Sequence, residues 1–219
     1  MSTILRSKLQ KVIDFITFPL RAVTLFENDR MGLSSLRSER FDYVSREVDG
    51  YCLDVGCGKH NLFITNYYNG HGTGIDVFQY EGLKEDNIIK DATHFPFEDN
   101  VYNTVTLIAN INHIPIGIRD IELAEIYRCT VPGGKIVVTM GHPLAEILVH
   151  KLVFLYDTLF GTNVDMDTER GMQEGESYFL TDKAIKGHLL KAQYQNIRKK
   201  YFLTQWGLNH LFVGYKRVE

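Results

Sequence analysis

Short apolar runs alternate with amphipathic stretches from about residue 50 to residue 140. Five apolar runs bounded by turn-forming residues predict strands, at 51–55, 73–77, 87–90, 103–109 and 134–140. Between them, apolar residues at helical spacing predict helices near 60–68 and 118–130. Strands and helices in this order are typical of βαβ units, which build a mostly parallel sheet.

Two further helices are predicted before the first strand, over residues 4–18 and 35–48. The first has apolar residues at helical spacing, and Pro19 should end or kink it. Its charged residues are basic, with Asp14 as the exception. Such a helix either packs its apolar face over the domain or lies on an anionic membrane surface.

The alternation breaks after residue 140. An apolar helix is predicted at 143–160, followed by a polar, acidic stretch at 161–177. Thr181 is placed to cap a helix that runs to about Gln193. Two final strands, at 196–204 and 210–216, are close enough to form a hairpin. The connection 141–180 is longer than usual, so it is interpreted as a lid that closes over a site and sets its specificity.

Composition is that of an ordinary globular protein, with 44% hydrophobic and 23% charged residues among 219. This length predicts one domain, divided into four parts: an N-terminal cover (1–48), a ligand-binding core (49–140), the lid (141–180) and a closing helix and strand pair (181–219). The net charge of −3 gives no argument for a nucleic-acid-binding surface. Three cysteines without metal spacing and no long apolar span predict a cytoplasmic protein.

The first predicted strand runs directly into a glycine turn. Residues 51–58 read Tyr-Cys-Leu-Asp-Val-Gly-Cys-Gly, so that Gly56 and Gly58 let backbone approach a ligand at the strand's carboxyl end. Asp76 ends the second strand and lies 22 residues beyond Asp54. An acidic residue about 20 residues past such a turn is placed to bind ribose hydroxyls. The pair indicates a nucleoside-containing ligand.

The turn lacks the third glycine of a dinucleotide fingerprint, because position 61 is Asn. It resembles motif I of class I S-adenosylmethionine-dependent methyltransferases. The resemblance extends in the right order over residues 50–140, through Asp91-Ala92-Thr93, Phe95-Pro96-Phe97, the run 104–110 and Val131-Pro132-Gly133-Gly134. It implies a doubly wound, mostly parallel seven-stranded sheet with an antiparallel last strand and helices on both faces. One departure is His60, where the family has glycine.

The resemblance also implies residues that bind S-adenosylmethionine and its product S-adenosylhomocysteine. The glycine turn is expected to contact the methionine moiety of the cofactor, and Asp54 its amino-acid end. The end of the second strand is expected to bind the ribose, and the loop after the third strand the adenine. The cofactor-binding candidates are Asp54, Gly56, Cys57, Gly58, Asp76, Val77, Asp91, Ala92 and Asn110.

A hydroxyl acceptor would need a general base, and histidine is the usual one. His113 follows the strand at 103–109, and His142 follows the strand at 134–140. Either could be the base, and both could be structural. The acidic run from Asp165 to Glu176 loosely resembles a calcium loop, but Arg170 replaces the turn glycine, so no metal site is predicted.

These features predict methyl transfer from S-adenosylmethionine to a small-molecule acceptor, with oxygen, nitrogen and carbon all open as the methylated atom. Because of the basic first helix, one alternative is a lipid-linked or membrane-partitioned acceptor, reached through peripheral membrane contact. A different class of function is a non-catalytic module that binds the cofactor or its product. Turnover of S-adenosylmethionine would separate the module from the enzymes.

Overall fold

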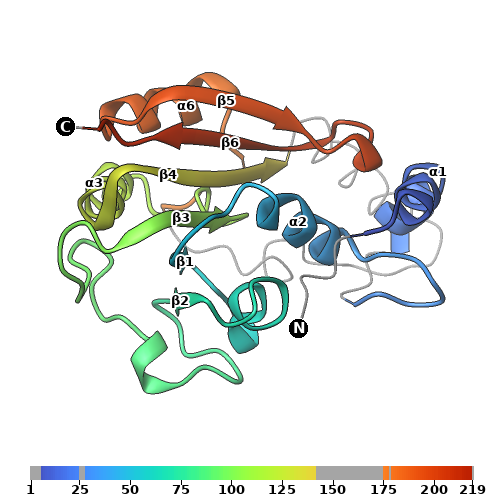
Figure 1. Ribbon diagram of the computed structural model, residues 1–219, viewed down its shortest axis with the longest axis horizontal. Coiled ribbons are helices and arrows are strands. Elements are labelled where there is room, and N and C mark those ends of the chain that lie inside the picture. Colours follow the sequence, from blue (N-terminus) through green and yellow to red (C-terminus); the bar gives the residue numbers. More distant parts are fainter. Residues whose placement is uncertain (1–5, 25–27, 142–174, 178, 219) are drawn as a thin grey trace.

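The computed structural model describes residues 6–24, 28–141, 175–177 and 179–218, which build an α/β fold around one sheet (Figure 1). The sheet has six strands in the order β2-β1-β3-β4-β6-β5. Their bounds are β1 Cys52–Val55, β2 Gly72–Ile75, β3 Tyr102–Ile108, β4 Thr130–Gly141, β5 Gln195–Tyr201 and β6 Asn209–Tyr215. Strands β1 to β4 are parallel, whereas β6 is antiparallel to both β4 and β5. The antiparallel last strand is therefore confirmed.

The sheet has six strands where seven were predicted. Residues 87–90 lie beside the end of β2 but make a single parallel bridge, between Asp76 and Ile88. Backbone hydrogen bonds flank it, from Asp76 N to Asn87 O at 2.8 Å and from Ile89 N to Asp76 O at 2.9 Å. β2 itself ends at Ile75, so little partner strand remains at that edge and the ladder does not extend.

Four α-helices are described: α1 Lys8–Thr24, α2 Leu36–Ser45, α3 Arg119–Cys129 and α6 Asp182–Lys191. α2 begins where the Ser35 side chain accepts a hydrogen bond from Ser38 N, and α6 begins at the predicted cap Thr181. Pro19 lies inside α1 and does not end it. The helix predicted at 143–160 falls outside the described residues.

The helix predicted at 60–68 is replaced by two short turns, a 3₁₀ turn at Lys59–Asn61 and a π turn at Phe63–Tyr67. The reason is the backbone conformation at His60, where the resembled family has glycine, and at the next residue. His60 has φ +60° and Asn61 has φ +47°, in the left-handed region where glycine is favoured. An α-helix cannot run through two such residues, so it does not start directly after the glycine turn.

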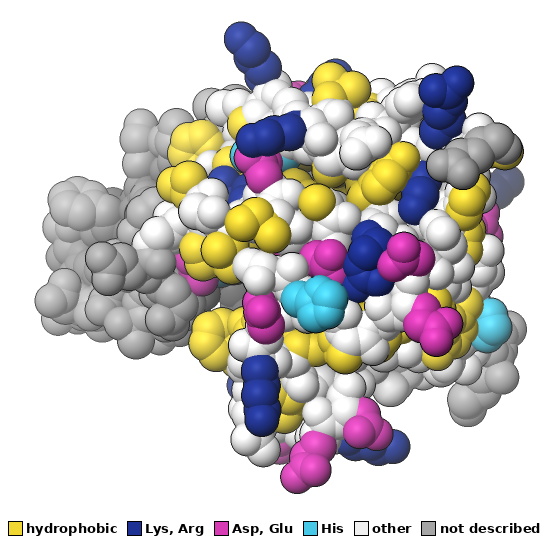
Figure 2. Space-filling model, turned by 90° about the vertical axis from the view of Figure 1, so that its left-hand side faces the viewer, with side chains coloured by type: hydrophobic (Ala, Val, Ile, Leu, Met, Phe, Trp, Pro, Cys, Tyr) yellow, Lys and Arg dark blue, Asp and Glu magenta, His cyan; other side chains and the backbone are white. Residues whose placement is uncertain are grey.

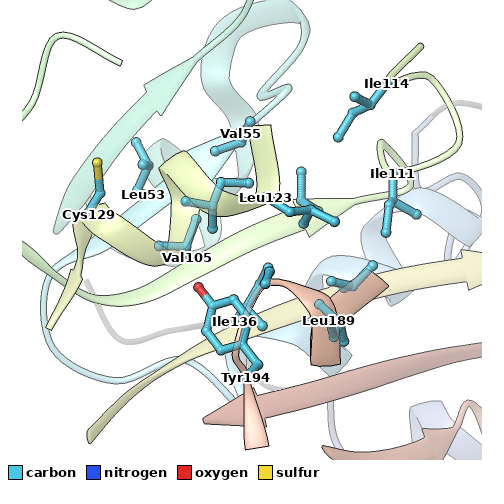
Figure 3. Packing of buried hydrophobic residues seen from close by; sticks show 14 of the residues in the cluster. Leu53, Val55, Val105, Ile111, Ile114, Leu123, Cys129, Ile136, Leu189 and Tyr194 are labelled. Carbon is cyan, nitrogen blue, oxygen red and sulfur yellow. The ribbon is translucent and has the colours of Figure 1, made fainter. Parts of the chain in front are cut away.

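Successive strand residues point to opposite faces, and each face has its own apolar core. On one face, Leu53, Val105 and Ile136 pack with residues of α3 and α6 such as Leu123 and Leu189 (Figure 3). The other face packs against α2 and the π turn, through a cluster that contains Phe41, Val44, Phe63, Val137 and Leu211. With both faces covered, the carboxyl ends of the parallel strands are the place where a ligand can approach.

The carboxyl ends of β3 and β4 point to the right in Figure 1, where α1 lies. The face on the opposite side carries interspersed acidic and basic side chains (Figure 2). Within the described part of the chain, no helix is long and apolar enough to cross a bilayer.

Candidate active site

A cavity of about 450 Å³ lies at the carboxyl ends of β1, β2 and β3. The glycine turn, the end of β2, the loop after β3 and the start of α3 contribute its walls. The lining residues are Val55, Gly56, Gly58, Ile75, Asp76, Val77, Phe78, Tyr80, Ile89, Ala92, Asn110, His113, Ile114, Pro115, Ile118, Glu122 and Glu176. The walls combine apolar residues with a few polar groups, the usual make-up of a small-molecule site.

The glycine turn brings bare backbone to the cavity wall. Gly56 has φ +73°, and a Cβ there would lie 2.2 Å from Asn110 Nδ2. Asn110 occupies that space because its Nδ2 donates to the carbonyl of Val55 at 3.2 Å. Gly58 has φ +61°, and a Cβ there would meet nothing within 4 Å. The predicted turn thus joins β1 to the loop after β3 and leaves Gly58 open to a ligand.

Asp76 is fixed at the end of β2. Its Oδ2 accepts from Gly58 N at 3.0 Å and its Oδ1 accepts from Phe78 N at 3.0 Å. Burial raises the pKa of Asp76, and these backbone hydrogen bonds oppose that rise. The carboxylate therefore holds the glycine turn against β2 while it lines the cavity beside Val77.

Two predicted cofactor residues lie behind the wall. Asp54 is buried in β1, and its Oδ1 accepts from Thr106 Oγ1 at 2.6 Å. Burial raises the pKa of Asp54 to about 7, and the Thr106 hydrogen bond opposes the rise. The Cys57 thiol is also buried, which raises its pKa. Neither side chain is among those that line the cavity.

The two cofactor-binding candidates in the loop after residues 87–90 lie in different surroundings. Ala92 lines the cavity, whereas Asp91 is exposed. Oδ1 of Asp91 accepts from Thr93 Oγ1 at 2.6 Å and from Thr93 N at 2.8 Å. Both bonds lower the pKa of Asp91, which caps its own turn here, as Asp readily does.

His113 lines the cavity and pairs with a carboxylate. Its Nδ1 lies 2.9 Å from Oε2 of Glu176, whose side chain is only 4% exposed. A carboxylate accepts, so the pairing favours the tautomer with its proton on Nδ1 and leaves Nε2 as an acceptor. Two backbone bonds, of 2.9 and 3.0 Å, join residues 175–177 to the loop 112–116 and hold the pair together. His142, the other candidate base, lies outside the described residues.

Glu122 is a site residue that sequence reasoning missed. It projects from the buried side of α3 and is 5% exposed. Its carboxylate has no hydrogen-bond partner in the described part of the chain. Burial and the nearby charge of Asp76 raise its pKa to about 8, although the charge of Arg119 opposes the rise. The available signal was spacing, because Glu122 follows Ile118 by four residues on the helix face that also carries Ile126.

Residues 53–138 match the family model of the methyltransferase domain. This range covers the glycine turn, Asp76, the Ala92 loop, His113 and α3. The fold agrees, since a SAM-dependent methyltransferase structure from Thermotoga maritima aligns with a TM-score of 0.60 at 12% identity and covers 95% of this chain and 98% of its own. Residues 53–138 are therefore a methyltransferase domain, and the fold around them is that of class I S-adenosylmethionine-dependent methyltransferases.

Two curated proteins of one name and a second solved structure are also similar to this chain. It is 27% identical over 191 residues to a demethylmenaquinone methyltransferase from Staphylococcus haemolyticus, with 78% of each chain covered. A protein of the same name from Lactobacillus johnsonii is 24% identical over 185 residues, with 74% of each chain covered. A SAM-dependent methyltransferase structure from Methanosarcina mazei has a TM-score of 0.55 at 17% identity and covers 81% of this chain and 98% of its own.

The cavity of the methyltransferase fits its cofactor. Gly58 offers backbone with no side chain in the way, and Asp76 offers a fixed carboxylate to a diol. Ile89, Ala92 and Ile118 add apolar side chains to the cavity wall, which suits a flat ring.

Proposed function

We propose that this methyltransferase acts on a quinone-type ring in its reduced, hydroxyl-bearing form. The observation that carries the proposal is the His113–Glu176 pair, which lines the cofactor cavity and leaves Nε2 of His113 without a hydrogen-bond partner among the described residues. The names of the two relatives compared above support a quinone-type acceptor.

For the cofactor, we propose that Asp76 and Val77 bind the ribose, that Gly56 and Gly58 lie along the methionine moiety, and that Ala92 contacts the adenine. When bound, S-adenosylmethionine supplies an electrophilic methyl group on a sulfonium. In this proposal Asp54, Cys57 and Asn110 act through the turn, because Asp54 and Cys57 lie behind the wall and Asn110 fastens Gly56.

His113 removes the hydroxyl proton of the acceptor through Nε2, and Glu176 stabilises the imidazolium that forms. The electron pair released on the acceptor makes the new bond to the methyl carbon as the sulfur–methyl bond breaks. That electron pair can attack from the hydroxyl oxygen or from the adjacent ring carbon. In the second case the His113 imidazolium returns its proton to the acceptor oxygen, and the imidazole then takes the proton of the ring carbon as the ring regains its aromaticity. The apolar surroundings at Ile114 and Pro115 exclude water from this step.

The test uses the full chain, labelled S-adenosylmethionine and a short-chain quinol that lacks a ring methyl group. His113→Gln should reduce turnover by roughly 100-fold while the affinity for S-adenosylhomocysteine stays within about twofold. Glu176→Gln should reduce turnover less, because the imidazole remains. Asp76→Ala should instead weaken S-adenosylhomocysteine binding by at least about 1.5 kcal/mol. Normal turnover in the His113 variant, or no turnover of any quinol by the parent protein, would refute the proposal.

A further inference from the structure

Helix α1 buries two of its charged side chains, Asp14 and Arg21. Arg21 is 1% exposed, and its guanidinium donates to Glu39 Oε2 at 3.0 Å and to the carbonyl of Thr204 at 3.3 Å. Asp14 is fully buried, and its Oδ2 lies 3.4 Å from Nε of Arg6. Rotation of the helix about its axis would separate these buried pairs, which is costly. The contacts therefore fix which face of α1 points outward.

The face that points outward is apolar. We define the outer face of α1 as one helical stripe together with two residues of the β5–β6 turn: Leu9, Val12, Ile16, Leu20, Leu203 and Trp206. Leu9 is 71% exposed, Ile16 is 68% exposed and Trp206 is 52% exposed. The Trp206 indole is part of the same surface, because its Nε1 donates to the carbonyl of Phe15 at 2.9 Å. An exposed apolar surface of this kind marks an interaction site.

Basic residues border the outer face. Lys8 is exposed and Lys11 is half-buried, and neither has an ion pair within the described ranges. A groove of about 630 Å³ beside the helix is lined by Lys11 and Lys200 together with Phe15 and Leu203. Lys200 pairs with Glu47 at 2.8 Å, so the positive charge that is free to act comes mainly from the two lysines of α1. Apolar residues with a basic border complement an anionic lipid surface.

We propose that the outer face of α1 docks this methyltransferase on an anionic phospholipid bilayer. α1 lies on the side to which the carboxyl ends of β3 and β4 point (Figure 1). The cavity opens at the carboxyl ends of the strands as well, so docking would place it on the membrane side of the protein. Resting on the function proposed above, this docking means that the acceptor is a lipid-soluble ring taken directly from the bilayer.

Sedimentation with vesicles tests the docking without cofactor or acceptor, so its outcome is independent of turnover. The full chain is mixed with vesicles of pure phosphatidylcholine or with vesicles containing about a third phosphatidylglycerol. We expect binding to the anionic vesicles that falls steeply with salt. The double variant Leu9→Gln/Ile16→Gln should bind at least about tenfold more weakly, since two exposed apolar side chains no longer enter the lipid. Lys8→Gln/Lys11→Gln should remove the preference for anionic lipid.

The matched control is Ile121→Gln/Leu190→Gln, which removes two apolar residues that are 50% and 61% exposed on α3 and α6 and should bind as the parent does. Equal binding of the Leu9/Ile16 variant and the parent, or no binding of the parent to anionic vesicles, would overturn the proposal. Sedimentation velocity without lipid is the second measurement. A dimer that the Leu9/Ile16 variant disrupts would overturn the proposal in favour of a second copy on this face. A fall of several degrees in that variant's melting temperature would overturn it in favour of coverage by the chain itself.

Discussion

The buried carboxyl of Glu122 should make the stability of the free protein fall as pH rises. Its pKa is raised to about 8 in the fold from an ordinary value of 4.5, chiefly by burial. The unfolded chain therefore loses this proton near 4.5, whereas the folded protein keeps it until about 8. The stabilisation is complete below the lower value and is lost as pH rises toward the upper one, at about 1.4 kcal/mol per pH unit. Between about pH 5 and about pH 8, the titration of Glu122 alone should lower the free energy of unfolding by roughly 3 kcal/mol.

The assay is urea unfolding of the parent and of Glu122→Gln at both pH values. The neutral amide removes the titration, so the two proteins should differ little near pH 5, and the variant should be more stable by roughly 3 kcal/mol near pH 8. Burial also raises the pKa of Asp54, but Asp54 titrates in both proteins, so its contribution cancels from the difference in unfolding free energy. Glu98→Gln is the control, since Glu98 is exposed. A constant difference between parent and Glu122→Gln across this pH range would refute the reasoning.

Two further substitutions test the turn and the core. Gly56→Ala should lower both stability and S-adenosylhomocysteine affinity, because the new Cβ would lie 2.2 Å from Asn110 Nδ2 and φ is +73°. Gly117→Ala is the matched control, since a Cβ there would meet nothing within 4 Å. Equal S-adenosylhomocysteine affinities of the two variants in calorimetry would contradict this explanation. Leu123→Ala should cost about 2–5 kcal/mol in urea unfolding, since Leu123 is fully buried between α3 and the sheet. Ile121→Ala on the exposed side of the same helix should cost less than about 1 kcal/mol, so a comparable loss there would argue against this packing.

The sequence alone determined the sheet core and the cofactor turn, because both depend on local pattern. Buried parallel strands are continuous apolar runs, and a left-handed turn needs glycine at Gly56 and Gly58. The cap at Thr181 and the position of Asp76 directly after β2 are local in the same sense. For these elements, the order of residues is enough to predict the arrangement.

Other features depend on residues far apart in the chain, so only the tertiary structure decided them. Glu176 meets His113 across 63 residues, and no local pattern links them. Asp91 and Asp76 look equivalent in sequence, yet one is exposed on its own turn and the other lines the cavity. The sequence also did not decide which face of α1 points to solvent, because helical spacing gives the apolar stripe but not its direction. The buried contacts of Arg21 with Glu39 and Thr204 set that direction, since charges taken from water must keep their partners.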